Sequence, residues 1–514
     1  MDKSFPVNRN FIIVSAALLV AVIFGYFLAQ FLGGAADWAG LGILVLVLGL
    51  PFIPVLVRWH QPILIFAWNA TLSLYFLPGS PSLWMLMAGC SLLIAVLSRA
   101  TDSKRRFVGA LSVVLPLLFL TGVVLATARL TGGMGMRVLG GQTFGGRSYV
   151  FIIAAVVGYF ALTSQAIPVE RAGRYIALFF LPGLLTVMSN VTYALGPKFY
   201  FFYFLFPPEF AMAQAQADYG LATQDMVRLG GMSWAGQVVF CFLLARYGIS
   251  GVLEFSKPWR IVLLVLAVFG SMFGGFRSGL ILLGLTFVAL FCLEGVWRTR
   301  LLPILLSALV IGAAAFLPLV EKMPLAVQRT LSFLPVNVDP LVRMDARGST
   351  EWRVEMWRVL VPEIPKYLLK GKGYAINPTD LYLASLGAAQ GLGASSEEAI
   401  VAGNYHNGPL SVIIPFGIFG SVCFLWFIAA SMRALYLNYR HGDPRLKRIN
   451  TFLLAIFVAW FVFFCGIFGG FHSDLHHFVG IVGLSIALNG GIRRPVSVPA
   501  SETLQLAPTG VGGN

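Results

Sequence analysis

The sequence predicts an all-α protein that is integral to a membrane and crosses it many times. Of its 514 residues, 58% are apolar and only 11% are charged, whereas about 25% of the residues of an ordinary soluble domain are charged. Apolar runs long enough to span a bilayer recur from one end of the sequence to the other. These observations exclude an ordinary soluble enzyme and indicate a polytopic membrane protein.

The net charge of +15 does not indicate nucleic-acid binding. The basic residues form short clusters between the apolar runs instead of one block, which is the pattern that sets membrane topology. The five cysteines all lie within apolar runs and form no CxxC pair, so we interpret them as small core residues. We therefore expect membrane lipids, and no nucleic acid, among the partners.

The apolar runs predict about fourteen transmembrane helices. Residues 11–32 are long enough to span and lack a small-residue cleavage pattern, so we expect a retained helix there and no cleavable signal peptide. The predicted spans begin near Phe11, Gly40, Pro62, Ser82, Phe107, Ser148, Tyr175, Gly231, Trp259, Gly279, Leu301, Pro409, Asn450 and Leu475.

The distribution of lysine and arginine predicts the orientation. With the amino terminus inside, 21 of the 36 basic residues fall on the inner side, nine lie in one long loop, and six lie in the other outer connections. Long loops cross the membrane largely regardless of charge, so the short connections decide the orientation. Both termini are predicted to be cytoplasmic, and the long loop is predicted to face outward.

This topology divides the chain into four parts. We expect eleven spans in residues 1–320, a large periplasmic loop with short amphipathic helices in residues 321–408, and three further spans in residues 409–490. Residues 491–514 are rich in proline, serine, threonine and glycine and are expected to be a disordered cytoplasmic tail. Two shorter outer segments are a glycine-rich stretch, residues 128–147, and residues 197–230. The latter carry an aromatic run at 199–206 that is typical of an interfacial belt or a re-entrant element.

The long loop contains one strong helix signal. Ser349 or Thr350 is the predicted N-cap, and Pro362 ends the helix. An apolar stripe suits a helix lying on the outer leaflet. It consists of Trp352, Met356, Val359 and Leu360. Residues 385–403, which are mostly small, are expected to be flexible.

Arg353 and Trp357 lie one turn apart on a neighbouring face of that helix. The pair either anchors the helix at the interface, or Arg353 offers a guanidinium fork to a diphosphate.

His406 stands at the outer mouth of a predicted span. A histidine near a helix start is often only a polar cap. Here it follows a loop with nine basic residues, and its neighbour Asn407 is placed to orient it. A neutral imidazole at this place would accept a proton from an attacking hydroxyl.

Arg277 lies between two spans that are joined by almost no connector. An arginine so close to the hydrocarbon is costly and suggests a functional site; the alternative is an arginine that snorkels to lipid headgroups. Its small neighbours, Gly275 and Ser278, leave room for a ligand.

Together these residues resemble the O-antigen ligase and polymerase superfamily, a group of polytopic glycosyltransferases of class C (GT-C) architecture. The resemblance covers about residues 260–425 and rests on motif order and on the side of the membrane. It is carried by Phe-Arg-Ser-Gly-Leu at 276–280, the helix at 349–357, Leu-Lys-Gly-Lys-Gly at 369–373, His-Asn-x-x-Leu at 406–410, and Gly-x-x-Gly at 417–420. The chain departs from the family pattern at Ser278, at Trp352 and at Pro415, which leaves the subfamily and the acceptor open.

The resemblance implies an inverting, metal-independent transfer of a glycan from an undecaprenyl-diphosphate carrier to an acceptor hydroxyl at the outer face of the bacterial inner membrane. Arg277 and Arg353 would hold the diphosphate, and His406 would activate the acceptor. No cofactor is expected. Further substrate-binding residues would be Asn407, Trp357, Arg347, Tyr405, His472 and His476.

Residues 472–477, His-Ser-Asp-Leu-His-His, permit a second interpretation. Imidazole and carboxylate groups at this spacing suit Zn²⁺, but a fourth ligand is not evident and the family chemistry needs no metal. We expect these groups to line the acceptor side of the same cavity or to lie solvated at its rim.

Two functions remain open from the sequence. The first is the glycosyltransferase, with a lipid core, a growing polysaccharide or a protein as acceptor. The alternative is a flippase or transporter of lipid-linked oligosaccharides without catalysis, which requires ionisable groups at mid-membrane and paired discontinuous helices. The predicted spans are nearly free of charge, and the cations gather at the outer rim, which favours the enzyme.

Overall fold

The computed structural model describes residues 53–75, 80–102, 107–135, 145–211, 227–390 and 397–495. The chain divides into two units, residues 1–63 and 64–514. In the first unit the described part, residues 53–63, begins helix α3 (Ile53–Trp68). The second unit contains all the residues expected at the functional site.

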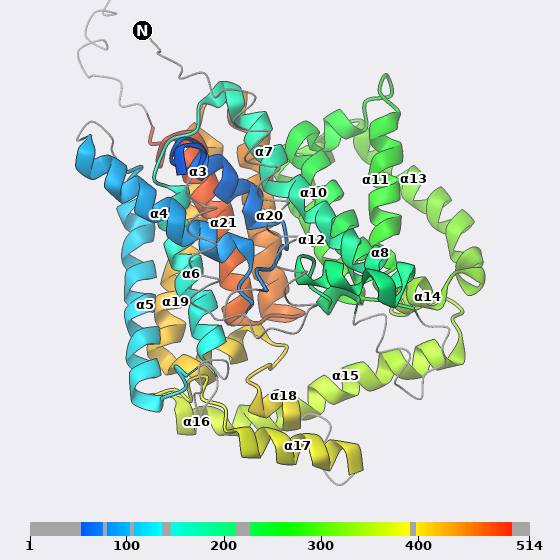
Figure 1. The fold of residues 1–514 in the computed structure, drawn as a ribbon. Coiled ribbons are helices and arrows are strands. Elements are labelled where there is room, and N and C mark those ends of the chain that lie inside the picture. Colours follow the sequence, from blue (N-terminus) through cyan, green and yellow to red (C-terminus); the bar gives the residue numbers. More distant parts are fainter. Residues whose placement is uncertain are drawn as a thin grey trace, which may run out of the picture. The chain divides into compact units, whose positions relative to one another are not determined.

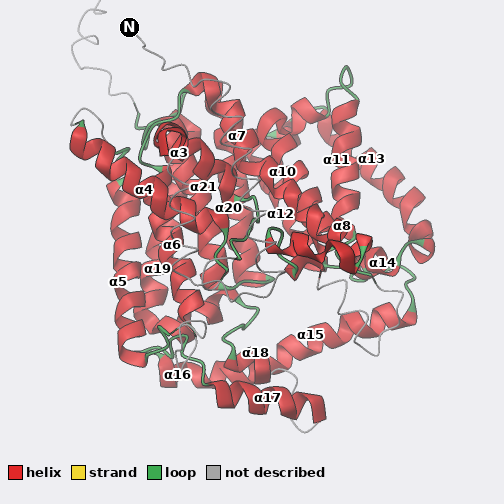
Figure 2. Ribbon diagram, viewed as in Figure 1, coloured by secondary structure: helices red, strands yellow, loops and turns green. Residues whose placement is uncertain are grey.

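Every named element of the described residues is a helix, as Figure 2 shows. Eight helical segments there are long and apolar enough to cross a membrane, and two shorter helices are also apolar. The all-helical, multi-pass prediction is therefore confirmed, whereas the count of fourteen and the outward loop remain predictions. The predicted spans near Phe11 and Gly40 lie outside the described residues.

The apolar helices of the second unit follow the predicted order closely. Their bounds are α4 (Leu83–Thr101), α5 (Leu111–Thr131), α6 (Gly146–Leu162), α7 (Ala172–Phe180), α8 (Val187–Leu195), α10 (Gly230–Val252), α11 (Trp259–Met272), α12 (Arg277–Glu294), α13 (Leu301–Phe316), α19 (Gly408–His441), α20 (Lys447–Gly466) and α21 (Phe471–Asn489).

The span predicted to begin near Pro62 is wrong. Helix α3 ends at Trp68, and the backbone beyond it pairs with distant residues instead of continuing the helix. Ser73 N–H donates to the carbonyl of Leu205 at 2.9 Å, and Leu83 N–H donates to that of Leu72 at 2.7 Å. These tertiary hydrogen bonds replace the helical ones, so hydrophobicity alone gave the wrong boundary.

The predicted outer loop is largely helical. It contains α14 (Leu325–Leu331), α15 (Pro340–Leu360), α16 (Ile364–Tyr367), α17 (Pro378–Gln390) and α18 (Glu397–Val401). In Figure 1, α15 and α17 lie at the lower end of the second unit and run across the direction of α5 and α19. The described part of the stretch expected to be flexible, residues 385–403, is helical in α17 and α18 and ends in a turn at residues 402–403.

Helix α15 begins nine residues before its predicted N-cap. Its N-cap is Asp339, whose Oδ1 accepts a hydrogen bond from Leu341 N–H at 2.8 Å, and Pro340 occupies the first turn. Ser349 and Thr350 therefore lie inside the helix, and the N-cap prediction was wrong. The helix ends at Leu360, just before Pro362, as predicted.

The apolar stripe of α15 packs against protein. Met356 and Leu360 form a buried cluster with Tyr405 and the start of α19, and Trp352 packs on its edge. Val359, the fourth predicted member, is 52% exposed. The burial of the stripe fixes α15 on the bundle, so the stripe is not free to enter the outer leaflet.

Helix α19 is interrupted near Pro415, and the long loop fills the interruption. Gly417 has a φ of +62°, and Ile418 N–H donates to the carbonyl of Leu368 at 2.7 Å. Lys372 N–H donates to the carbonyl of Ile414 at 2.8 Å. Backbone groups released by the break are thus paired, as they must be inside a membrane protein.

Three other expected segments can be compared with the structure. Most of the aromatic run lies in a 3₁₀ helix, η5 (Pro197–Phe204). Of the glycine-rich segment, residues 136–144 lie outside the described residues. So does the tail from residue 496 onward.

Candidate active site

One face of α15 collects the polar groups of the site. Ala346, Ser349, Thr350, Arg353 and Trp357 are spaced at i, i+3, i+4, i+7 and i+11, so they lie along one side of the helix. This face places the predicted Arg353–Trp357 pair in line with the groups that bind Arg277.

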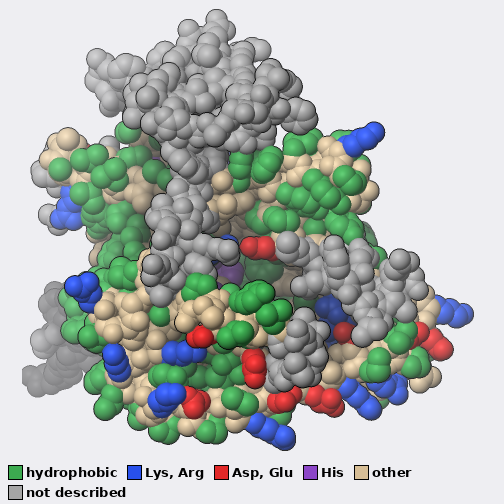
Figure 3. Space-filling view, turned by 60° about the horizontal axis from the view of Figure 1, so that its bottom comes forward, with side chains coloured by type: hydrophobic (Ala, Val, Ile, Leu, Met, Phe, Trp, Pro, Cys, Tyr) green, Lys and Arg blue, Asp and Glu red, His purple; other side chains and the backbone are tan. Residues whose placement is uncertain are grey.

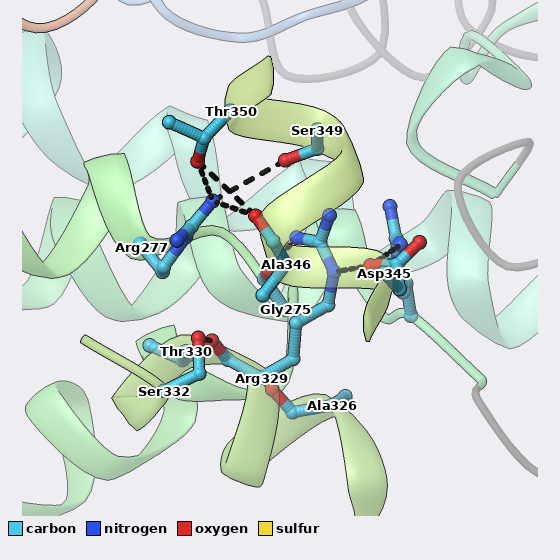
Figure 4. Close-up of polar contacts among 11 residues, drawn as sticks. Gly275, Arg277, Ala326, Arg329, Thr330, Ser332, Asp345, Ala346, Ser349 and Thr350 are labelled. Atoms are coloured by element: carbon cyan, nitrogen blue, oxygen red, sulfur yellow. Dashed lines mark hydrogen bonds and ion pairs between the residues drawn. The ribbon is translucent and has the colours of Figure 1, made fainter. Parts of the chain in front are cut away.

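Arg277 is the first residue of α12 and points at that face. Its Nη2 donates to the carbonyl of Ala346 at 2.8 Å, to Ser349 Oγ at 3.2 Å and to Thr350 Oγ1 at 3.1 Å, as drawn in Figure 4. Two predicted motifs that are about 70 residues apart in sequence therefore meet in space. Ser349 and Thr350 do not cap the helix; their hydroxyl groups accept hydrogen bonds from Arg277.

Two further arginines, Arg228 and Arg329, lie beside Arg277. Asp345 Oδ2 accepts hydrogen bonds from Arg329 Nε and, at 3.2 Å, from Arg228 Nη2. Arg329 Nη1 also donates to the carbonyl of Gly275, two residues before Arg277. Two guanidinium groups thus bind one carboxylate, and one of them also holds the turn that precedes Arg277.

Arg353 is partly buried and carries its charge next to an aromatic ring. Its guanidinium carbon lies 5.8 Å from the centre of the Phe468 ring. Burial lowers the pKa of Arg353, and the charges of Arg277 and Arg329 lower it further. The same field that disfavours its proton favours an anion at this position.

His406 lies between two aromatic side chains. Its ring centre is 5.2 Å from that of Trp352, in an edge-to-face arrangement, and 5.0 Å from that of Phe468. Phe468 therefore touches both His406 and Arg353. The residue adopts a φ of +48°, which is uncommon outside glycine and is typical of functional positions.

The imidazole of His406 is held in its neutral form. Burial lowers its pKa to about 4, and the charge of Arg353 contributes. Its Nδ1 is buried and has no hydrogen-bond partner within the described ranges. A neutral ring with an unpaired nitrogen is the state in which histidine accepts a proton.

Trp357 and Asn407, two predicted substrate-binding residues, fix the backbone on either side of His406; that they bind substrate remains a prediction. Trp357 Nε1 donates to the carbonyl of Tyr405 at 3.0 Å and so fixes the backbone next to the imidazole. Asn407 is the N-cap of α19, and its Oδ1 accepts from Leu410 N–H at 3.0 Å. The prediction that Asn407 orients the imidazole by its side chain is therefore corrected: that side chain caps the helix.

Tyr405 and Arg347 lie away from the polar face. The Tyr405 side chain is 1% exposed within the apolar cluster under α15. Arg347 is exposed and lines a surface pocket with Arg343 and Glu351 on the other side of α15. The family resemblance implied that Arg347 binds substrate, and this remains a prediction for a side chain that lines the surface pocket.

The histidines of α21 lie in different surroundings. His476 is buried, stacks on Trp68 with ring centres 4.7 Å apart, and its Nε2 lies 3.0 Å from the carbonyl of Trp68. His472 is partly buried and faces Tyr374 at 5.9 Å. His476 is therefore packed in the protein and not solvated at the rim, whereas the alternative, that these groups line the acceptor side of the cavity, remains a prediction.

The residues 472–477 do not assemble a metal site in the structure. Asp474 is buried and its Oδ2 accepts from Gly470 N–H at 2.8 Å. Across the described ranges, no group of three or more His, Cys, Asp or Glu side chains is arranged to hold a metal ion. Metal independence of the reaction remains a prediction.

Sequence reasoning missed Arg228, Arg329, Asp345 and Phe468. Arg228 directly precedes a predicted span, and this position was the available signal for it. Arg329 and Asp345 are two of many charged residues in the long loop, and no spacing distinguishes them. In Figure 3, which brings this end of the molecule forward, a hollow opens with a histidine on its wall and charged side chains beside it.

Comparison with known proteins identifies the region that contains most of these residues. Residues 262–425 match the model of a family described as O-antigen ligase. The match includes Arg277, Arg329, Asp345, Arg353 and His406, and it confirms the resemblance that the motifs indicated. The comparison with curated proteins gives no match.

Proposed function

Because residues 262–425 match the O-antigen ligase family, we propose that the protein transfers a glycan from an undecaprenyl-diphosphate carrier to an acceptor hydroxyl at the outer face of the bacterial inner membrane. One observation carries the proposal. Arg277 binds the face of α15 on which Arg353 lies, and the neutral imidazole of His406 contacts the same Phe468 ring as Arg353. A cationic site thus lies next to a base.

The charge of the site suits a diphosphate. Arg277 uses one terminal nitrogen for its contacts to α15, which leaves its other N–H groups for a ligand. Arg353 makes no hydrogen bond or ion pair among the described residues. Its pKa is lowered first by burial and then by the positive charges of Arg277 and Arg329. A diphosphate would relieve this repulsion and accept charge-assisted hydrogen bonds.

The chemical step is a single displacement. The acceptor oxygen attacks the anomeric carbon, and the bond from that carbon to the diphosphate oxygen breaks with its electron pair on the diphosphate. His406 takes the acceptor proton as the new bond forms. The arginines stabilise the charge that develops on the leaving group, so positioning and electrostatics supply most of the catalysis. Attack opposite the leaving group inverts the anomeric centre.

The apolar carrier would enter laterally between helices, and its glycan would reach the site from the outer face. The acceptor is a lipid core sugar, a growing polysaccharide or a protein hydroxyl, which differ in size but present the same nucleophile. Membrane lipids surround the spans.

The transporter alternative draws on one specific feature, the interrupted helices α10 and α19. Gly248 breaks α10 with a φ of +66°, and the Glu294 carboxylate accepts from Ile249 N–H at 3.0 Å. The break in α19 is filled by residues 368–373. Because both breaks are paired with protein groups, neither offers free backbone to a transported substrate, which favours the enzyme.

The test uses purified full-length protein in detergent with an undecaprenyl-diphosphate glycan and a panel of acceptors. Detergent removes the two compartments that transport needs, so a transferase still forms product whereas a flippase does not. Arg353→Gln is expected to lower the transfer rate about 10²-fold. Arg358→Gln, an exposed arginine on the same helix, is the matched control. Absence of product with every acceptor class, in protein that binds the donor, would contradict the proposal.

A further inference from the structure

Asp345 is the acidic member of the arginine cluster. Its Oδ2 joins Arg228, which directly precedes α10, to Arg329 of α14. The side chain of Arg329 is only 7% exposed and that of Asp345 is 31% exposed. The carboxylate therefore lies at the edge of the site, while one of its partners is buried beneath it.

Asp345 also precedes the residue that holds Arg277. The carbonyl of Ala346 accepts from Arg277 Nη2 at 2.8 Å, and Arg329 extends from Asp345 to the carbonyl of Gly275. Gly275 lies in the turn that leads into α12 and has a φ of +68°. One turn of α15 thus fixes Arg277 from two sides, through its contact to Ala346 and through the turn before it (Figure 4).

We infer that Asp345 is a positioning residue of the glycan transfer: it holds Arg228 and Arg329 and, through the Gly275 turn, sets the direction of the Arg277 guanidinium toward the donor diphosphate. The inference rests on the proposed function. Asp345 does not touch the reacting atoms. Its role is to fix the geometry of neighbours that do, because a small displacement of such groups costs much of the rate.

The effect of neutralising Asp345 distinguishes a positioning role from a purely electrostatic effect on donor binding. Asp345 repels an incoming diphosphate, so its neutralisation alone would strengthen donor binding. If Asp345 instead aligns the arginines, its neutralisation slows transfer even though the site becomes more positive. Burial and the charge of Arg329 lower the pKa of Arg228, whereas Asp345 raises it, which fits a carboxylate that stabilises crowded guanidinium groups.

The experiment compares Asp345→Asn, Asp345→Glu and Glu355→Gln in purified full-length protein. Asparagine keeps the size of the side chain and removes its charge, whereas glutamate keeps the charge. Glu355 is an exposed carboxylate of α15, about three turns beyond Asp345. Donor dissociation constants and single-turnover transfer rates are measured separately with an undecaprenyl-diphosphate glycan.

We expect Asp345→Asn to lower the single-turnover rate about tenfold to hundredfold, with donor affinity unchanged or higher. Asp345→Glu should recover part of the rate, and Glu355→Gln should behave as wild type. A wild-type rate for Asp345→Asn, or equal losses of rate and affinity, would overturn the inference. Failure of the wild type to transfer glycan would overturn the proposed function instead.

The loss of a counter-ion for buried Arg329 can prevent folding of Asp345→Asn. The double variant Asp345→Asn/Arg329→Gln removes both charges and restores a neutral pair. It is expected to fold and to remain slow, because the link to Gly275 is gone. A double variant that folds and transfers at the wild-type rate would also overturn the inference.

Discussion

At the residue scale, His406 shows how local environment prepares a general base. The ring lies between Trp352 and Phe468, and the backbone of His406 has a φ of +48°. The fixed carbonyl of Tyr405, held by Trp357, keeps this conformation. A chemically ordinary histidine becomes a neutral, oriented acceptor because of what surrounds it.

The pH dependence of transfer should report this environment. The pKa of His406 is lowered from 6.5 to about 4, so the imidazole stays unprotonated until the pH falls through about 4. We expect kcat/KM to be flat from about pH 5.5 to 7.5, with loss only in more acidic solution. The check is a pH profile of the purified enzyme in detergent. A midpoint at 6.5 would show that the ring is solvated or that another group is the base.

His406→Ala should separate catalysis from binding. We expect transfer to fall by about 10²- to 10⁴-fold, the usual contribution of a general base, while the donor dissociation constant changes little. Single-turnover rates and donor binding are the measurements. If His406→Ala transfers at the wild-type rate, His406 serves only structure, and His472 becomes the next residue to test.

Arg353 should require a guanidinium and not only a charge. Arg353→Ala is expected to weaken donor binding and to lower the transfer rate about 10²-fold, because the contact exists before the transition state and strengthens in it. Arg353→Lys should recover only part of the activity, since an ammonium lacks the bidentate fork. Full recovery of the transfer rate with lysine would mean that the site requires only a positive charge at this position.

At the scale of the elements, the interruption of α19 fastens the long loop to the bundle. The loop residue Gly371 has a φ of +75°, and a Cβ there would collide with the carbonyl of Pro415. Because α16 and the loop after it pair with the broken helix, the position of α15 depends on this joint. The joint therefore connects stability to the geometry of the site.

Substitution of Gly371 should test the joint. Gly371→Ala is expected to destabilise the protein by more than about 1 kcal/mol, because both φ and the contact forbid a side chain. Gly348→Ala is the control: Gly348 lies inside α15, and a Cβ there meets nothing within 4 Å. It should be neutral or stabilise by up to about 1 kcal/mol. Thermal denaturation in detergent measures both, and equal effects would refute the proposed role of the joint.

At the scale of the whole molecule, topology decides whether the site faces the donor. The distribution of basic residues predicts that the helices α14 to α18 lie outside and that the connection between α19 and α20 lies inside. A glycan carried on the outer leaflet would reach the site only in this orientation.

Cysteine labelling should establish the orientation. In a cysteine-free background, Lys366→Cys is expected to react with a membrane-impermeant reagent in intact spheroplasts, whereas His441→Cys should react only after the membrane is opened. Both positions are exposed in the structure. Labelling in the opposite sense would place the site in the cytoplasm and contradict the proposed donor side.

The sequence by itself determined the class of this protein and most of its apolar helices. The hydrocarbon core of a bilayer offers no hydrogen bonds to the backbone, so a chain crosses it as long apolar helices. Composition and the length of apolar runs therefore suffice to find these helices. The motifs at Arg277, Arg353 and His406 were also recognisable, because few charged or polar groups compete with them near the predicted spans.

Only the tertiary structure decided which loop residues belong together. Ser349 and Thr350 looked like caps but bind Arg277, Asn407 caps a helix instead of orienting His406, and Arg347 lines a surface pocket. Arg329 and Asp345 had no distinguishing sequence signal, yet they meet beside Arg277. The physical reason is that such contacts depend on helix rotation and on backbone pairing between residues far apart in the chain, which no local pattern encodes.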